Sequence, residues 1–87
     1  MCEYMQKIRP DMDIGHNIRK LRIENHMTQE EVIARLQLLG VDISRSTYAK
    51  LECGLMNIKV SELVGLRNIF SCRFDDFFEG LELEDDQ

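Results

Sequence analysis

Apolar residues recur along most of the chain at the three- and four-residue spacing of α-helices, and no long stretch alternates between apolar and polar positions. Ile14, Ile18 and Leu21 define one apolar face of a helix over about residues 13–25. Only one proline, at position 10, interrupts the chain, so little in the sequence opposes helix formation. The pattern predicts an all-α domain.

The ends of the predicted helices carry recognisable capping residues. The first helix would be capped by Asp11 or Asp13 and would stop near Asn25. Thr28 followed by Glu31 predicts a capping box at the start of a second helix. These signals place the first helix break at about residues 25–28.

The second helix buries Val32, Ile33 and Leu36 and stops at Gly40. Ser44 is the expected N-cap of a short third helix over about residues 45–53, with Gly54 after its end. Between these helices, residues 37–43 either extend the second helix by a turn or form a loose loop.

Two further helices are predicted after Gly54. A broad apolar face over about residues 59–70 predicts a fourth helix that is the central and most buried one. Residues 74–78 form a short fifth helix that turns Phe74 and Phe77 inward and leaves Phe78 exposed. The sequence therefore predicts five helices in a single bundle.

Three stretches resemble, in their order along the chain, the phage-repressor and Cro-like helix-turn-helix domains of the XRE family: residues 18–22, 27–32 and 44–54. The apolar spacing from Val60 to Phe77 is similar to the fourth and fifth helices of that family, so the resemblance covers about residues 13–78. It implies a compact five-helix bundle of the lambda-repressor-like DNA-binding type. The connection before Ser44 is several residues longer than the family usually has.

In such domains the second helix of the motif enters the major groove, which is about 12 Å wide. Arg45 offers a bidentate pair to guanine, and Lys50 reaches a base or a phosphate. Gln29 stands at a helix N-terminus suited to a phosphate, with a solvated first-turn residue as the alternative. The candidate DNA-binding residues are Thr28, Gln29, Ser44, Arg45, Ser46, Thr47, Ala49, Lys50, Asn57 and Lys59.

Four other residues have structural interpretations. The resemblance implies an ion pair between Arg22 and Glu52 that locks the recognition helix against the first helix. Thr47 has a second possible role in supporting the start of its own helix. Tyr48 is expected to bury its ring with its hydroxyl at the surface, and base stacking is the less favoured alternative.

The charge first argues against nucleic acid, because the formal net charge is −5 and the pI about 4.9. The acids are concentrated at the end of the chain, where residues 75–86 hold seven acids and no base. All 11 Lys and Arg lie in residues 1–74 with nine acids, which leaves that part at +2. We expect the acidic end to weaken binding to random DNA by repelling phosphates.

Other classes of protein find no support in the residues. No run of apolar residues approaches a membrane span or a signal-peptide core, so we expect a cytoplasmic protein. Cys2, Cys53 and Cys72 form no CxxC pair and are expected as reduced thiols. His16 and His26 lack neighbouring ligands, so we expect no metal and no cofactor. No catalytic motif or small-molecule site is evident, which argues against an enzyme.

The length of 87 residues allows one small domain. We divide the chain into an N-terminal arm (1–12), a helix-turn-helix DNA-binding domain (13–78) and an acidic C-terminal tail (79–87). The expected function is a sequence-specific transcriptional regulator, a repressor that binds a palindromic operator in double-stranded DNA as a homodimer. The alternative is a protein-interaction module on the same fold, either antitoxin-like or binding a partner through its acidic tail.

Overall fold

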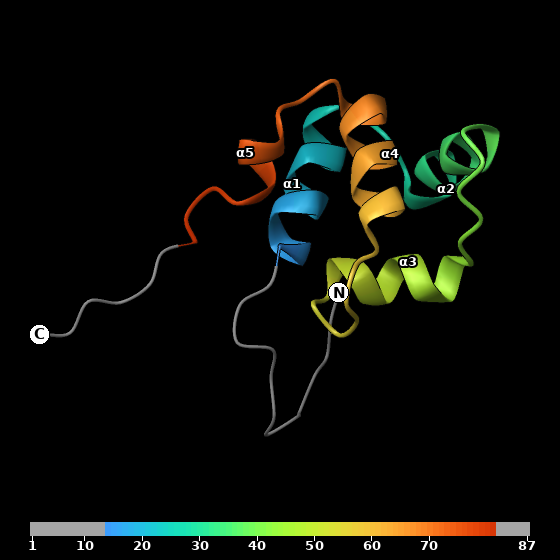
Figure 1. Ribbon diagram of the computed structural model, residues 1–87, viewed down its shortest axis with the longest axis horizontal. Coiled ribbons are helices and arrows are strands. Elements are labelled where there is room, and N and C mark those ends of the chain that lie inside the picture. Colours follow the sequence, from blue (N-terminus) through green and yellow to red (C-terminus); the bar gives the residue numbers. More distant parts are fainter. Residues whose placement is uncertain (1–13, 82–87) are drawn as a thin grey trace, which may run out of the picture.

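A computed structural model describes residues 14–81, and this part of the chain contains five helices and no strand. They are α1 (Gly15–Glu24), α2 (Gln29–Leu38), α3 (Arg45–Glu52), α4 (Val60–Phe70) and α5 (Phe74–Phe77). α3 lies across one end of the bundle (Figure 1), where both α1 and α2 pack against it, while α4 packs against α2 and α5 packs against α1. The prediction of an all-α five-helix bundle is confirmed.

The break between α1 and α2 follows from local chemistry. The Thr28 hydroxyl accepts from the backbone N–H of Glu31, whose carboxylate accepts from the backbone N–H of Thr28, so the predicted capping box is confirmed. His26, rather than Asn25, adopts the left-handed conformation after α1. The N-cap of α1 is Ile14, without a side-chain cap, and the two expected aspartates lie outside the described residues.

The long connection between α2 and α3 consists of a turn at Gly40 followed by a segment without regular secondary structure. α2 ends at Leu38, and Gly40 takes a φ of 87° that an L-residue rarely adopts. Val41 is half-buried and Ile43 is buried, with exposed Asp42 between them. The segment is therefore anchored to the core by alternate side chains and is not a loose loop.

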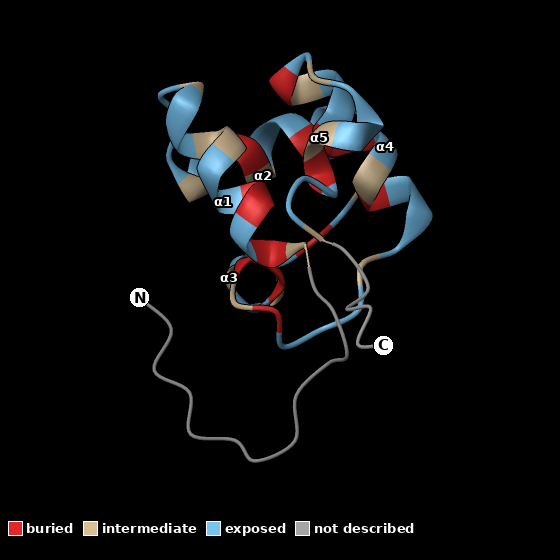
Figure 2. Ribbon diagram, turned by 90° about the vertical axis from the view of Figure 1, so that its left-hand side faces the viewer, coloured by how far each residue is buried: buried red, intermediate tan, exposed pale blue. Residues whose placement is uncertain are grey.

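The core lies between the helices, where buried segments of different elements meet (Figure 2). It consists of Ile18, Val32, Leu36, Ile43, Tyr48, Leu51, Leu66, Phe70 and Phe77. α4 is not enclosed as predicted, because Val60 is 78% exposed and Val64 is exposed as well. The buried residues of α4 are Glu62, Gly65, Leu66 and Phe70, and Gly65 lets the helix approach Leu36 closely.

The fifth helix differs from the prediction in one side chain. Phe77 is fully buried and Phe78 is exposed as expected, but Phe74 is exposed rather than turned inward. The guanidinium of Arg67 lies 4.8 Å from the centre of the Phe74 ring, so this ring packs against a cation at the surface. α5 has only four residues, and a single turn can bury few side chains.

A buried polar residue fastens α5 to α1. The Asn17 amide donates to the backbone carbonyls of Phe77 at 2.8 Å and of Glu79 at 2.9 Å. Asn17 is buried between the apolar positions of α1. Its donors satisfy carbonyls that the short helix leaves unpaired at its C-terminal end.

The expectation of reduced thiols holds for Cys72, which is free. It is wrong for Cys53, which is disulfide-bonded. Burial and the neighbouring Asp76 carboxylate raise the pKa of the Cys72 thiol, so this group stays protonated near neutral pH.

Candidate nucleic-acid interface

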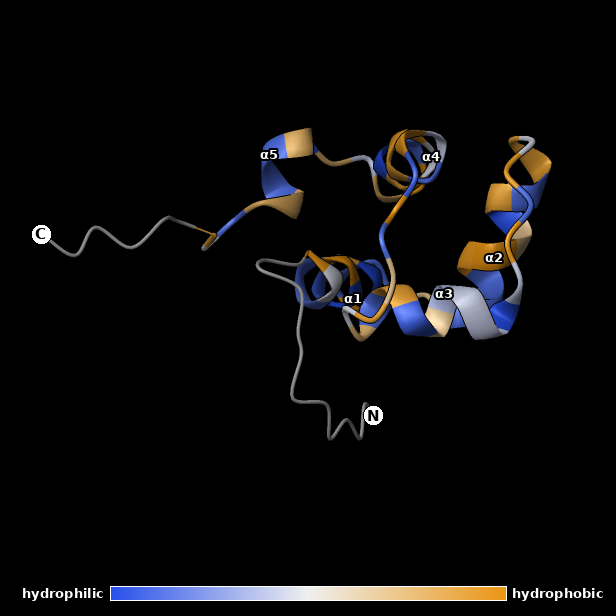
Figure 3. Cartoon of the chain, turned by 60° about the horizontal axis from the view of Figure 1, so that its bottom comes forward, coloured by the Kyte–Doolittle hydropathy of each residue, from blue (hydrophilic) through white to orange (hydrophobic). Residues whose placement is uncertain are grey.

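α3 presents one polar face to solvent and buries the other. Tyr48, Leu51 and Glu52 are buried, whereas Arg45 and Lys50 are exposed. Figure 3 shows α3 as a largely hydrophilic helix along one side of the domain, away from α4. A helix with this exposure can enter a groove without disturbing the core behind it.

The start of α3 is fixed by its own side chains. Ser44 is the N-cap, as predicted, and its hydroxyl accepts from the backbone N–H of Thr47 at 3.1 Å. The two hydroxyls are also hydrogen-bonded to each other at 3.0 Å. Thr47 therefore supports the start of its own helix. Ser46 is exposed and Ala49 is half-buried, so together with Arg45 and Lys50 they line the outer face.

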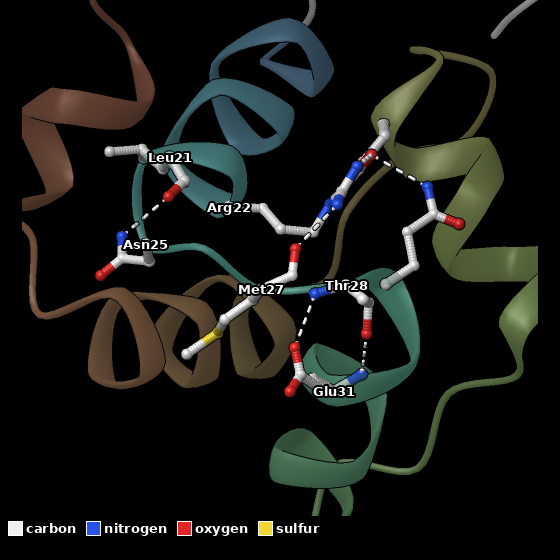
Figure 4. A network of polar contacts seen from close by, with 8 residues as sticks. Leu21, Arg22, Asn25, Met27, Thr28 and Glu31 are labelled. Carbon is white, nitrogen blue, oxygen red and sulfur yellow. Dashed lines mark hydrogen bonds and ion pairs between the residues drawn. The ribbon is translucent and has the colours of Figure 1, made fainter.

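Behind this face, α3 is held to α1 by an ion pair. Arg22 Nε donates to one oxygen of Glu52 at 2.7 Å, and Arg22 Nη2 donates to the other at 3.1 Å. The side chains are only 13% and 2% exposed. Arg22 Nη1 also donates to the carbonyl of Met27 at 2.9 Å (Figure 4), which ties the pair to the chain entering α2.

Burial opposes ionisation of Glu52, but hydrogen bonds from its neighbours, Arg22 foremost, outweigh it and hold the pKa of this carboxyl below its usual range. Glu52 is therefore charged at neutral pH. Arg22 and Glu52 thus act as a matched pair of charges that fixes the angle between α1 and α3.

Tyr48 lies deeper than predicted. Its ring belongs to the core, but its hydroxyl does not reach the surface and makes no hydrogen bond within the described part of the chain. Burial, together with the adjacent Glu52 carboxylate, raises the pKa of Tyr48 far above its usual value. A fully buried ring cannot stack on a base.

The residues at the start of α2 already have partners within the protein. The Gln29 amide donates to Glu52 at 3.0 Å, which joins α2 to the end of α3. Thr28 uses its hydroxyl in the capping box. Gln29 is thus neither a solvated residue nor an unengaged phosphate donor in this structure.

Glu30, which sequence reasoning missed, contacts the leading candidate for base recognition. One carboxylate oxygen of Glu30 lies 3.0 Å from Arg45 Nη2, and the two side chains are 58% and 70% exposed. The residues are separated by a connection of unusual length, so no spacing rule could have paired them. The only signal in the sequence was an acid in the first turn of a presumed DNA-binding element.

Asn57 and Lys59 lie in the connection between α3 and α4, and both are exposed. The backbone N–H of Lys59 donates to Glu62 at 2.8 Å, which fixes the entry into α4. This connection starts at the end of the bundle that α3 crosses (Figure 1).

A family model described as helix-turn-helix matches residues 18–77. This chain belongs to the Cro/C1-type helix-turn-helix family. The family consists of DNA-binding transcription regulators and is not typically enzymatic. No curated protein sequence matches the chain.

Within residues 14–81 no helix is long and apolar enough to cross a membrane. No group of three or more His, Cys, Asp or Glu side chains is placed to hold a metal ion in this range. α2 and α3 lie within the matched residues, and in a helix-turn-helix the second helix of the pair is the recognition helix.

Proposed function

We propose that this family member is a sequence-specific repressor that binds a palindromic operator as a homodimer, with α3 in the major groove. The observation that carries the proposal is the exposed outer face of α3, formed by Arg45, Ser46 and Lys50 and backed by the Arg22–Glu52 pair. A recognition helix must be held rigidly by the rest of the domain, because base edges are read by hydrogen bonds with narrow geometric tolerance.

Within this arrangement each residue has a distinct role. Arg45, as the first residue of α3, reads guanine with paired donors, and Ser46 adds a hydroxyl at the groove floor. Lys50, Asn57 and Lys59 face the phosphates along the rest of the helix and the connection after it. Ala49 leaves room for close approach to a base.

Gln29 requires a modified role. Its amide donates to Glu52, so a direct phosphate contact would break a hydrogen bond that helps to hold α3. We infer that Gln29 supports binding mainly by keeping α2 against α3. Gln29→Ala should then lower both stability and affinity for all sequences, with base preference unchanged.

The homodimer follows from the size of one module. A single module buries about 600–1,000 Å² on DNA, and two half-sites about one helical turn apart are the usual route to a useful affinity. α5 offers exposed Phe78 as part of the surface between two copies. Sedimentation of the free protein and of its Phe78→Ser variant tests this, and an unchanged association state of the variant would exclude Phe78 from the contact.

The decisive experiment is selection of bound duplexes from a random pool, followed by gel shifts over a range of salt concentrations. We expect a palindromic sequence with a guanine in each half-site and a binding constant that falls steeply with salt. Arg45→Ala should relax the guanine preference, by about fivefold or more, while Lys59→Ala weakens binding to every sequence. Recovery of no common sequence, even at low salt, would refute sequence-specific binding.

A reporter gene with the selected sequence across its promoter separates repression from activation. Repression requires the wild-type protein to lower expression and Arg45→Ala to restore it. Increased expression with the wild-type protein would contradict the repressor assignment without affecting DNA binding.

A further inference from the structure

The first turn of α2 touches both ends of the recognition helix through neighbouring side chains. Gln29 donates to Glu52 in the last turn of α3, and Glu30 pairs with Arg45 at its first residue. α2 therefore lies across α3 and constrains it at two points. The two contacts differ in kind, because the first is shielded from solvent and the second is exposed.

The exposed contact leaves Arg45 able to bind a base. The pair with Glu30 uses Nη2 at 3.0 Å, whereas a guanidinium carries five N–H donors in a fixed plane. Paired donors can therefore still meet guanine while the carboxylate holds the opposite side of the group. An arginine without a partner would instead sample many rotamers and would lose that freedom only on binding.

The same carboxylate changes how Arg45 responds to phosphate. An arginine paired with an acid is close to neutral as seen from a distance, so its attraction to the DNA backbone is weak. Reading guanine depends on short-range donor geometry and survives this neutralisation. Glu30 therefore opposes sequence-independent binding while preserving base recognition.

We propose that Glu30 is a specificity-determining positioning residue, which aims Arg45 at a base edge and discourages its use as a phosphate ligand. This inference rests on the proposed function, because it presumes that Arg45 reads a base. It predicts that Glu30 raises the ratio of specific to random binding, beyond what its negative charge alone would do.

The test compares Glu30→Gln with Glu31→Gln, a matched control that removes the same charge at the next position. Glu31 caps α2 through Thr28, and glutamine also serves in a capping box, so the control keeps the helix start intact. The probes are the duplex selected by the wild-type protein, the same duplex with the guanine at the Arg45 position replaced, and a random-sequence duplex of equal length.

Both variants should bind the random duplex more tightly than the wild-type protein does, because each removes a carboxylate near the DNA. Only Glu30→Gln should also lose guanine preference, by about threefold to tenfold, because only Glu30 contacts Arg45. In an Arg45→Ala background Glu30→Gln should have no further effect on base preference. The melting temperature of Glu30→Gln should stay within about 4 °C of wild type, since the pair is exposed.

Equal guanine preference in Glu30→Gln and Glu31→Gln would overturn the positioning role and leave the proposed function standing. A loss of preference that persists without Arg45 would also overturn it, because the effect would then act through another residue. If the wild-type protein selects no sequence, both the proposed function and this inference fail.

Discussion

Removing the Glu52 carboxylate tests whether the ion pair behind α3 holds the recognition helix in place. Glu52→Ala deletes the acceptor of two hydrogen bonds from Arg22 and of one from Gln29. The Arg22 side chain, which is 13% exposed with its partner in place, would be left largely buried without its counter-charge.

Breaking a buried ion pair by removing one partner costs about 3–5 kcal/mol. The lower end applies here, because Arg22 keeps its hydrogen bond to the carbonyl of Met27 at 2.9 Å. A loss of about 3 kcal/mol in a domain of this size lowers the melting temperature by about 12–24 °C. Glu52→Gln keeps an acceptor without the charge and should lose about half as much, since charge-assisted hydrogen bonds are about twice as strong as neutral ones.

Thermal and urea unfolding followed by circular dichroism at neutral pH measure these differences. A charge-specific effect also depends on pH. The folded pKa of Glu52 lies below its unfolded value, so its contribution to stability is complete above the unfolded pKa and is lost as the pH falls through the folded pKa. The gap between wild type and Glu52→Gln should therefore close in acid.

Replacing both partners with methionine shows how much of the stability loss comes from leaving a buried charge unpaired and how much from losing the attraction between the two charges. Arg22→Met with Glu52→Met removes the stranded guanidinium and should recover most of the stability that Glu52→Ala loses. A Glu52→Ala melting temperature within about 2 °C of wild type would refute the reasoning, because no loss near 3 kcal/mol is compatible with it.

Three other substitutions probe the packing around the recognition helix. Gly15→Ala should lower the free energy of unfolding in urea by about 2 kcal/mol, because its Cβ would overlap the backbone carbonyl of Leu51. An unchanged free energy of unfolding would show that α1 can shift away from α3 without cost. Tyr48→Phe should leave the melting temperature unchanged or raise it by up to about 8 °C, because it removes a buried hydroxyl that has no hydrogen-bond partner among residues 14–81, and a fall in melting temperature would reveal a hydrogen bond there. Asn17→Ala should cost about 2 kcal/mol by leaving the buried carbonyl of Phe77 without its donor, and an unchanged urea midpoint would mean that α5 does not depend on this amide.

The helix boundaries were predictable where they depend on neighbouring residues. The capping box of Thr28 and Glu31 and the N-cap Ser44 act within one turn, so the starts of α2 and α3 could be read from sequence. Asn17 could also have been found, because a polar residue stands there on the apolar face of α1. Buried polar residues on such faces are usually hydrogen-bonded.

The features that sequence reasoning missed depend on how elements pack. A helix of one turn has no periodicity to show which of its phenylalanines faces inward, so Phe74 was misplaced. Tyr48 lies on α3, which packs against α1 and α2, and its depth depends on this packing and not on its neighbours in sequence. The pair of Glu30 and Arg45 requires the angle between two helices joined by an atypical connection.

A net charge of −5 is a poor guide to DNA binding here, because several glutamates of α2, α3 and α4 are engaged in the structure. Glu31 caps α2, Glu62 caps the entry to α4, and Glu52 is neutralised by Arg22. Each carboxylate serves an internal donor, which reduces its field toward an approaching phosphate. Among these acids Glu30 alone is paired with a candidate base-reading side chain. The charge that matters for recognition is therefore local, and substitution of this residue should alter specificity more than any change in the total.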